Sequence, residues 1–396
     1  MTILLTLLLW GMAVVIFIPC LFLLIECLAA CLPSRFVTTT KDGSPKVAIL
    51  IPAHNEAMVI EQTIESLLPQ LQPSHRLVVI ADNCDDQTAD LARKKGVTAI
   101  ERANLEQRGK GYALDYGIRF LASDPPDVVI VIDSDMIAAP KTIDELSKMC
   151  CQSGRPVQGI DLLEPPLNPT AKETISALAF LVKNRVRATG LARLGLPCLL
   201  AGTGMAIPWA ALSKVIIASG NLVEDMQLGI DLAIAGYPAL FCENAQVIGT
   251  FPNQEQAAKT QRTRWEHGHL KTLCTQVPRL IKAAILQQRL DLLSLALEIG
   301  VPPLSFLVLL WSTAIFIGLL SGIFSGIWLP VLLIALAGLC LLFAILVAWF
   351  NFGRPTISGK ALLSIPIYLV WKMPLYLAFL IRPESQWIKT QRNTVS

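Results

Sequence analysis

Two carboxylates one residue apart, Asp133 and Asp135, are the strongest chemical signal in this chain of 396 residues. They directly follow five β-branched residues, Val128 to Ile132, and such a run is typical of a strand buried on both faces. Carboxylate oxygens are the ligands that Mg²⁺ and Mn²⁺ prefer, and open α/β sheets bind ligands beyond the carboxyl ends of their strands. The pair therefore predicts a divalent-cation site suited to a diphosphate. A turn with two solvated acids is the alternative, because the dipeptide spacing alone is a weak motif.

The residues around this pair alternate between strand-like and helix-like patterns. Strands are expected at 46–52, 76–81, 97–100 and 128–132, and helices at 55–70, 88–95 and 111–121. This alternation predicts a parallel α/β sheet. Asp82 ends the second strand, so it should lie near Asp133 at the carboxyl edge. Asn55 is expected either to contact a ligand or only to cap the helix that follows it.

The sequence pattern after residue 135 is less regular. Residues 170–194 form a helical pattern rich in Lys and Arg, which fits either a helix along the membrane surface or an ordinary surface helix. Residues 199–208 are expected to form a strand whose glycines allow a substrate to approach closely. Helices are expected at 226–235, opened by Glu224 and Asp225, and at 253–273. In the latter, Gln261, Arg264 and Trp265 share one face.

The composition indicates a membrane protein with a polar middle. Apolar residues make up 53% of the chain, charged residues only 16%, and the mean hydropathy is +0.55. Residues 3–25 carry no charge and are long enough to cross a bilayer. Basic residues follow this segment and none precedes it, so the amino terminus is predicted outside and the polar middle in the cytoplasm. A cleaved signal peptide is a weaker interpretation, because there is no basic residue before the apolar run.

The carboxyl-terminal region is apolar as well. Residues 301–351 carry no charge and predict two spans with a break near 321–326. Residues 361–381 are either a third span or a re-entrant or interfacial helix, and the basic residues that follow favour the non-crossing alternative. The chain is therefore divided into an amino-terminal transmembrane helix and linker (1–33), a cytoplasmic catalytic domain (34–299) and a membrane region (300–396).

Other classes of protein fit poorly. A net charge of only +3 does not indicate a nucleic-acid partner. The ten cysteines contain no Cys-x-x-Cys pair, so reduced, buried thiols are expected rather than disulfides or a zinc site. His54, His267 and His269 match no standard zinc spacing.

Six motifs in order resemble the membrane-embedded members of glycosyltransferase family 2. That group includes cellulose, hyaluronan, chitin-oligosaccharide and poly-N-acetylglucosamine synthases, and ceramide glucosyltransferases are related to it. The motifs are Pro52-Ala53-His54-Asn55-Glu56, Asp82, Gly109-Lys110-Gly111, Asp133-Ser134-Asp135, Glu224-Asp225 and Gln261-x-x-Arg264-Trp265. The resemblance implies a GT-A fold, a Rossmann-like mixed sheet with helices on both faces, together with flanking transmembrane helices.

The resemblance also implies a role for each residue. Asp135, with Asp133, would bind Mg²⁺ or Mn²⁺, and Asp225, with Glu224 beside it, would supply the general base. The nucleotide sugar would be held by Pro52, Asn55, Glu56, Asp82, Lys110, Asp133 and Ser134, and the diphosphate and acceptor by Gly204, Gln261, Arg264 and Trp265.

The implied function is inverting transfer of a sugar from a UDP-glucose or UDP-N-acetylglucosamine type donor to a glycan, at the cytoplasmic face of the inner membrane. Transfer of one sugar to a ceramide, diacylglycerol or polyprenyl lipid is the close alternative, and nucleotidyl or phosphotransfer is a remote one. Membrane lipids and export or assembly subunits are the other expected partners. Thr203 is followed by Gly-Met-Ala-Ile, not by the Cys-Gly-Ser type of motif of cellulose synthases, which argues against processive secretion.

Overall fold

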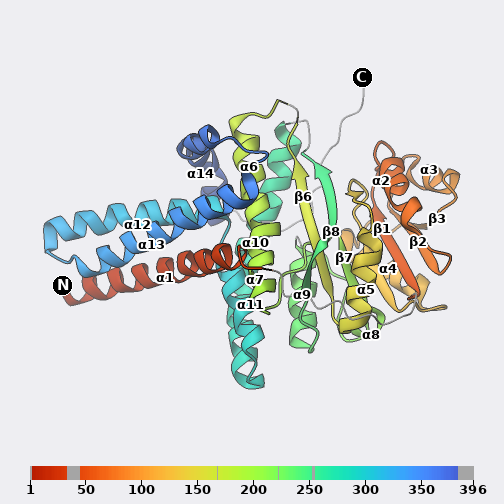
Figure 1. Ribbon diagram of the computed structural model, residues 1–396, viewed down its shortest axis with the longest axis horizontal. Helices are drawn as coiled ribbons and strands as arrows, with labels where there is room; N and C mark the ends of the chain where they lie inside the picture. The colour runs from red at the N-terminus through yellow and green to blue at the C-terminus, as the bar shows by residue number, and fades with distance from the viewer. Residues whose placement is uncertain (1, 34–44, 167, 222, 252–254, 382–396) are drawn as a thin grey trace.

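The computed structural model describes residues 2–33, 45–166, 168–221, 223–251 and 255–381 (Figure 1). An eight-stranded sheet lies at one end of the molecule and a bundle of apolar helices at the other. The strands are β1 (Val47–Ala53), β2 (His75–Asp82), β3 (Thr98–Arg102), β4 (Val128–Val131), β5 (Ile137–Ala138), β6 (Val157–Glu164), β7 (Met205–Pro208) and β8 (Leu240–Thr250). Their order in the sheet is β3-β2-β1-β4-β7-β6-β8-β5.

The sheet is mixed, as the resemblance predicts. Strands β3, β2, β1 and β4 are parallel, which confirms the α/β pattern of the first half of the catalytic domain. Strand β7 runs antiparallel to β4 and to β6, whereas β6 and β8 are parallel to each other. The sequence pattern alone predicted neither β6 nor β8.

Helices cover both faces of the sheet because successive residues of β1 point to opposite sides. Val47, Ile49 and Ile51 pack on one face, beneath α2 (Ile60–Leu67) and α5 (Thr142–Ser153). Ala48 and Leu50 belong to the core on the other face, beneath α4 (Lys110–Leu121). All five residues are at most 1% exposed, so the central strand is buried on both faces. The shorter elements nearby are α3 (Thr88–Lys94), η1 (Leu68–Gln70) and α8 (Trp209–Leu212).

The helices between the sheet and the bundle carry the remaining polar motifs. They are α6 (Ala171–Leu181), the π-helical turn η2 (Val182–Arg187), α7 (Ala188–Arg193), α9 (Glu224–Ile234), α10 (Glu255–Gln287) and α11 (Leu290–Gly300). One continuous apolar core runs from the sheet through α6 and α7 into the bundle. The sheet and the apolar helices are therefore not packed as separate units.

The segment 170–194 is an interior element, and both surface interpretations of it are wrong. Helix α7 packs against α1 (Thr2–Ala29), and Gly190 contacts the backbone of Glu26. Arg187 is 4% exposed and forms ion pairs with Glu26 (2.7 Å) and with Glu298 of α11 (2.8 Å). A buried arginine is tolerated because two carboxylates compensate its charge.

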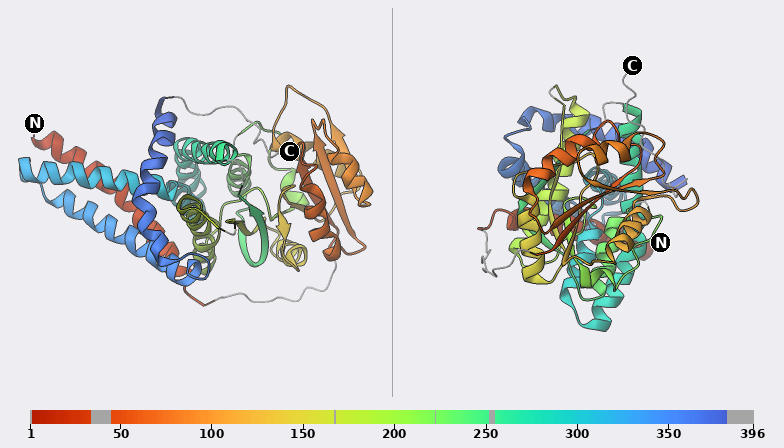
Figure 2. Two further views of the ribbon diagram at one scale, coloured as in Figure 1. Left: turned by 90° about the horizontal axis from the view of Figure 1, so that it is seen from above. Right: turned by 90° about the vertical axis from the view of Figure 1, so that its right-hand side faces the viewer.

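Among the described residues, four helices are long and apolar enough to cross a membrane. They are α1, α12 (Leu304–Ser325), α13 (Leu329–Ala348) with η3 (Trp349–Gly353), and η4 (Gly359–Ser364) with α14 (Ile365–Ile381). Helices α1, α12 and α13 lie side by side as a bundle (Figure 1). Helix α14 instead runs across the base of this bundle, next to the catalytic domain (Figure 2, left).

Candidate active site

A cavity of about 900 Å³ opens at the carboxyl edge of the parallel strands. The loops after β1, β2 and β4 bring Glu56, Asp82 and Asp133 to its wall, because the carboxyl ends of neighbouring parallel strands meet at one edge. Of the residues expected at the site, all but Gly204 line it: Pro52, Asn55, Glu56, Asp82, Lys110, Asp133, Ser134, Asp135, Glu224, Asp225, Gln261, Arg264 and Trp265.

The loops after β1 and β2 are bonded to each other. Asn55 has a left-handed backbone (φ 55°), and its side-chain oxygen accepts a hydrogen bond from the Asp85 backbone N–H (2.8 Å). The interpretation of Asn55 as a helix cap is wrong, since the N-cap position of α2 is Val59. Asp82 forms an ion pair with Arg102 (2.6 Å), and both side chains are under 10% exposed. The end of the cavity next to these loops is therefore rigid and polar.

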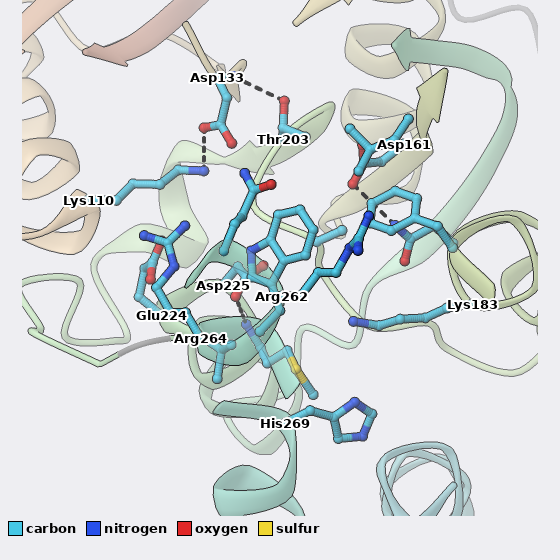
Figure 3. A pocket seen from close by; sticks show the side chains of 18 of the residues that line it. Lys110, Asp133, Asp161, Lys183, Thr203, Glu224, Asp225, Arg262, Arg264 and His269 are labelled. Atoms are coloured by element: carbon cyan, nitrogen blue, oxygen red, sulfur yellow. Dashed lines mark hydrogen bonds and ion pairs between the residues drawn. The ribbon is translucent and has the colours of Figure 1, made fainter. Parts of the chain in front are cut away.

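Lys110, the first residue of α4, contacts two sides of the cavity. Its ammonium forms an ion pair with Asp133 (Figure 3). It also donates a hydrogen bond to the Gly202 carbonyl (2.8 Å). Burial alone would lower the pKa of Lys110, but the charges of Asp133, Glu224 and Asp225 raise it. Lys110 therefore stays protonated and can bind a phosphate oxygen.

Gly202 has a left-handed backbone (φ 87°) and lies against these charged groups. A Cβ atom at this position would lie 3.0 Å from both the Asp225 Oδ2 and the Lys110 Nζ. Only glycine leaves room for the carboxylate and the ammonium at this loop without backbone strain.

The first turn of α9 presents Glu224 and Asp225 to the cavity. Asp225 Oδ1 accepts a hydrogen bond from the Met226 backbone N–H (2.8 Å), one of the donors that a helix amino terminus leaves unpaired. Burial, with the adjacent Asp225 charge adding to it, raises the pKa of Glu224 to about 7, whereas Lys110 opposes that shift. Two neighbouring carboxylates thus differ in environment, as in acid–base sites where the two groups have different roles.

Helix α10 supplies the opposite wall. The Arg264 Nε is buried and has no hydrogen-bond partner among the described residues, so this guanidinium has capacity for an anion. Trp265 packs on Phe180 of α6 with ring centroids 5.8 Å apart. The next residue, Glu266, forms a buried ion pair with Lys372, which fixes α10 to α14.

The segment 199–208 differs from the prediction. Only Met205–Pro208 form a strand (β7), and Gly204 precedes it with a left-handed backbone (φ 59°). A Cβ atom on Gly204 would lie 2.9 Å from the Val247 side chain of β8. Gly204 therefore packs inside the sheet and does not line the cavity, so the geometry gives no support for its expected contact with the acceptor. Thr203 lines the cavity instead, and its hydroxyl accepts a hydrogen bond from the Asp133 N–H (3.0 Å).

The cavity lining also includes polar residues that sequence reasoning did not assign to the site, among them Asp161, Lys183, Asn184 and His269. Asp161 lies on β6, and burial raises its pKa well above the usual range. Asn184 donates a hydrogen bond to it (3.2 Å). Burial lowers the pKa of His269 to about 3, so this imidazole is neutral; its Nε2 lies 3.2 Å from the Ile299 carbonyl. The spacing of residues 176, 180, 183, 184 and 187 on one helical face was the available signal.

The residues present fit a divalent cation. Asp133 and Asp135 both line the cavity and offer hard oxygen ligands. The described residues contain no group of three or more His, Cys, Asp or Glu side chains placed to hold a metal ion. Diphosphate oxygens and water would complete the coordination, which is usual for Mg²⁺ sites that bind through substrate phosphates.

Comparison with known proteins agrees with this geometry. Residues 45–268 match the family described as "Glycosyltransferase like family 2". That match covers more than half of the chain, so the chain belongs to this family, and it is a glycosyltransferase.

Individual relatives are distant. The chain is 35% identical over 99 residues to a probable glycosyltransferase, YdaM, of Bacillus subtilis (23% of each chain). It is 24% identical over 260 residues to glucomannan 4-beta-mannosyltransferase 7 of Arabidopsis thaliana (60% of this chain, 45% of the relative). The chain thus spans less than half the length of these relatives. The mannosyltransferase PcManGT of Pyrobaculum calidifontis, solved with GDP-Man and Mn²⁺, shares the fold (TM-score 0.52, 16% identity, 87% of this chain and 99% of that one).

Proposed function

We propose that this glycosyltransferase transfers a sugar from a nucleoside diphosphate sugar to a hydroxyl group with inversion at the anomeric carbon. The observation that carries the proposal is that Lys110, Asp135, Asp225 and Arg264 converge on one cavity, from three helices and the loop after β4. The name of the Arabidopsis relative, a glucomannan mannosyltransferase, supports a hydroxyl group of a sugar as the acceptor.

In this proposal the donor binds at the sheet edge. Asn55, Glu56 and Asp82 hold the nucleoside, and the diphosphate lies between Lys110 and Arg264. A divalent cation held by Asp135 and Asp133 would neutralise charge that develops on the leaving diphosphate. Lys110 and Arg264 contribute to the same stabilisation as fixed positive groups in a site sheltered from water.

Asp225 acts as the base. It takes the proton of the acceptor hydroxyl while the oxygen forms a bond to the anomeric carbon. The bond from that carbon to the diphosphate oxygen breaks, and the electron pair leaves with the nucleoside diphosphate. The hydrogen bond from Met226 N–H holds the Asp225 side chain at the start of α9.

We further propose the topology predicted from charge. Helices α1, α12 and α13 cross the inner membrane with the amino terminus outside, the catalytic domain lies in the cytoplasm, and α14 lies along the inner interface. The direction of α14 across the base of the bundle supports this arrangement (Figure 2).

The test is incubation of the purified full chain with UDP-glucose, UDP-N-acetylglucosamine and GDP-mannose. Each donor carries ¹⁴C in the sugar and ³²P in the β-phosphate, and lipid-soluble, polymeric and water-soluble products are separated. We expect ¹⁴C without ³²P in the acceptor fraction. Transfer of ³²P would instead identify the phosphotransferase alternative, and consumption of none of these donors would refute the proposed donor class.

A further inference from the structure

Part of the cavity lies beyond the residues that the proposed function assigns to the donor. Beyond Asp225 it continues into a polar part, here called the inner chamber, lined by Asp161, Lys183, Asn184 and His269. It then reaches an apolar part, here called the membrane-side wall, formed by Leu23 of α1, Pro302 and Leu304 at the start of α12, and Tyr368 of α14. The chamber thus connects the reaction centre to the ends of three helices that could span a membrane.

Lys183 is the distinctive group of the inner chamber. It is exposed, but its exposed surface faces the cavity, and its ammonium points inward (Figure 3). It has no hydrogen-bond or ion-pair partner among the residues that the structure describes. Burial lowers its pKa, and the Asp225 charge opposes that shift more than any other group does. An ammonium near the base and without a partner of its own can donate hydrogen bonds to an acceptor.

The charges of the chamber favour an uncharged head group. Arg187, the next cation along the wall, is already compensated by Glu26 and Glu298. Lys183 therefore faces the Asp225 carboxylate, whereas burial favours the neutral form of Asp161. A phosphate placed here would meet the negative charge of Asp225. Hydroxyl groups can donate to the Asp225 carboxylate, form hydrogen bonds with the Asp161 carboxyl group and accept from Lys183, so a sugar or glycerol head fits better.

The bundle itself leaves no passage for a growing glycan in the part of the chain that the structure describes. Ala13, Ala337 and Ala344 are 0% exposed at the contacts between α1 and α13. Gly338 leaves no room for a side chain beside Trp311, whose indole N–H donates to the Ile334 carbonyl (2.9 Å). An acceptor that reaches the membrane-side wall must therefore enter beside the bundle rather than through it.

We infer that the inner chamber and the membrane-side wall together bind an amphiphilic acceptor. Its uncharged, hydroxyl-bearing head lies between Lys183 and Asp161 with one hydroxyl directed to Asp225, and its apolar tail lies along Leu23, Leu304 and Tyr368. This inference rests on the proposed function, because it assigns the acceptor of the same reaction.

The test compares acceptors that share a head and differ in the tail. Transfer by the purified full chain is measured to methyl, hexyl and octyl β-glucoside, each below its critical micelle concentration, with a donor that the chain consumes. KM should fall by at least about tenfold from methyl to octyl, since burial of two methylene groups already suffices for that factor. Equal KM values for the three glucosides would overturn the inference while leaving the proposed function intact. A donor that is not consumed with any acceptor would count against the proposed function instead.

Two variants of α12 test where the apolar tail of the acceptor binds. Leu304→Trp fills the membrane-side wall and should bring the methyl-to-octyl ratio of KM values close to one. Leu310→Trp is the matched control, because Leu310 lies on the same helix, is 37% exposed and does not line the cavity. An unchanged methyl-to-octyl ratio of KM values in Leu304→Trp would show that the tail does not bind at the membrane-side wall. More efficient transfer to octyl phosphate than to octyl glucoside would overturn the uncharged head, and the wild-type chain-length series decides the tail even if Leu304→Trp fails to fold.

Discussion

At the donor end of the cavity, side chains come from short loops at the ends of neighbouring strands, within one continuous stretch from Pro52 to Asp135. At the acceptor end, lining residues come from β6, η2, α10, α11, α12, α14 and α1, which contribute between one and six residues each. The donor end is therefore fixed by the sheet, whereas the acceptor end depends on how helices of the membrane region pack on the catalytic domain. Variants at the two ends should separate hydrolysis of the donor from transfer to an acceptor.

The largest expected effect is at the metal-binding carboxylates. Asp135→Ala should reduce both donor hydrolysis and sugar transfer to background, because it removes the main ligand of a cation that both reactions need. Nucleoside diphosphate release measures hydrolysis, and Mn²⁺ added after EDTA should restore the wild type only. Asp90→Ala, at an exposed acid of α3, is the control. Full activity of Asp135→Ala, or of the wild type in EDTA, would show that the donor end works without a metal.

The next largest effect, at the proposed base, separates transfer to the acceptor from binding of the donor. Asp225→Asn should lower transfer by about 10²–10⁴-fold, the usual loss for a positioned base, while donor affinity stays near the wild-type value. Glu224→Gln should lower it less. If Glu224→Gln were the damaging change and Asp225→Asn retained near wild-type turnover, the base would be Glu224.

A smaller effect concerns pH. The raised pKa of Glu224, about 7, means that this group is mostly protonated below pH 7 and ionised above it. The ionised form adds a negative charge near Lys110 and Arg264, so the donor KM should rise, by less than about tenfold, as the pH increases through 7. Glu224→Gln should flatten this profile. Asp225→Asn should shift it to lower pH, because the Asp225 charge contributes to the raised pKa; an unchanged profile in both variants would assign the titration to another group.

The smallest expected effect is at the contact between α14 and α10. Lys372→Gln breaks the buried ion pair with Glu266, beside Trp265, and should reduce transfer a few-fold with little change in donor affinity. The double variant Lys372→Gln/Glu266→Gln should recover part of the loss, because it removes the uncompensated carboxylate. Lys360→Gln, at an exposed lysine of η4, is the control. A loss of donor affinity in Lys372→Gln would show that α14 acts on the donor end as well.

The difference between the donor end and the acceptor end of the cavity also explains which residues could be predicted from the sequence. The strands β1, β2 and β4 are short apolar runs, and each is followed at once by its functional residues, so the donor end could be derived from local pattern. Strand β6 escaped prediction because the buried polar residues Gln158 and Asp161 interrupt its apolar pattern.

The acceptor end depends on partners far away in the chain. Lys183 and Arg187 looked like surface residues because their helix is rich in basic residues. The carboxylates that allow Arg187 to be buried, Glu26 and Glu298, are 161 and 111 residues away, and no local pattern connects them. Asn55 shows the same limit on a smaller scale, since its bond to Asp85 joins two loops and replaces the helix cap that its neighbours suggested.

The ion cluster of Arg187, Glu26 and Glu298 has a practical consequence for anyone who wishes to express the catalytic domain alone. Removal of residues 1–33 would take away Glu26, one of the two carboxylates that neutralise Arg187. It would also expose the apolar face of α7 against which α1 packs. We expect such a fragment to aggregate, and we expect the full chain in detergent to elute as a single peak in size-exclusion chromatography. A monomeric, donor-hydrolysing fragment of residues 34–299 would show that α1 is only an anchor; otherwise the first helix is a structural part of the enzyme.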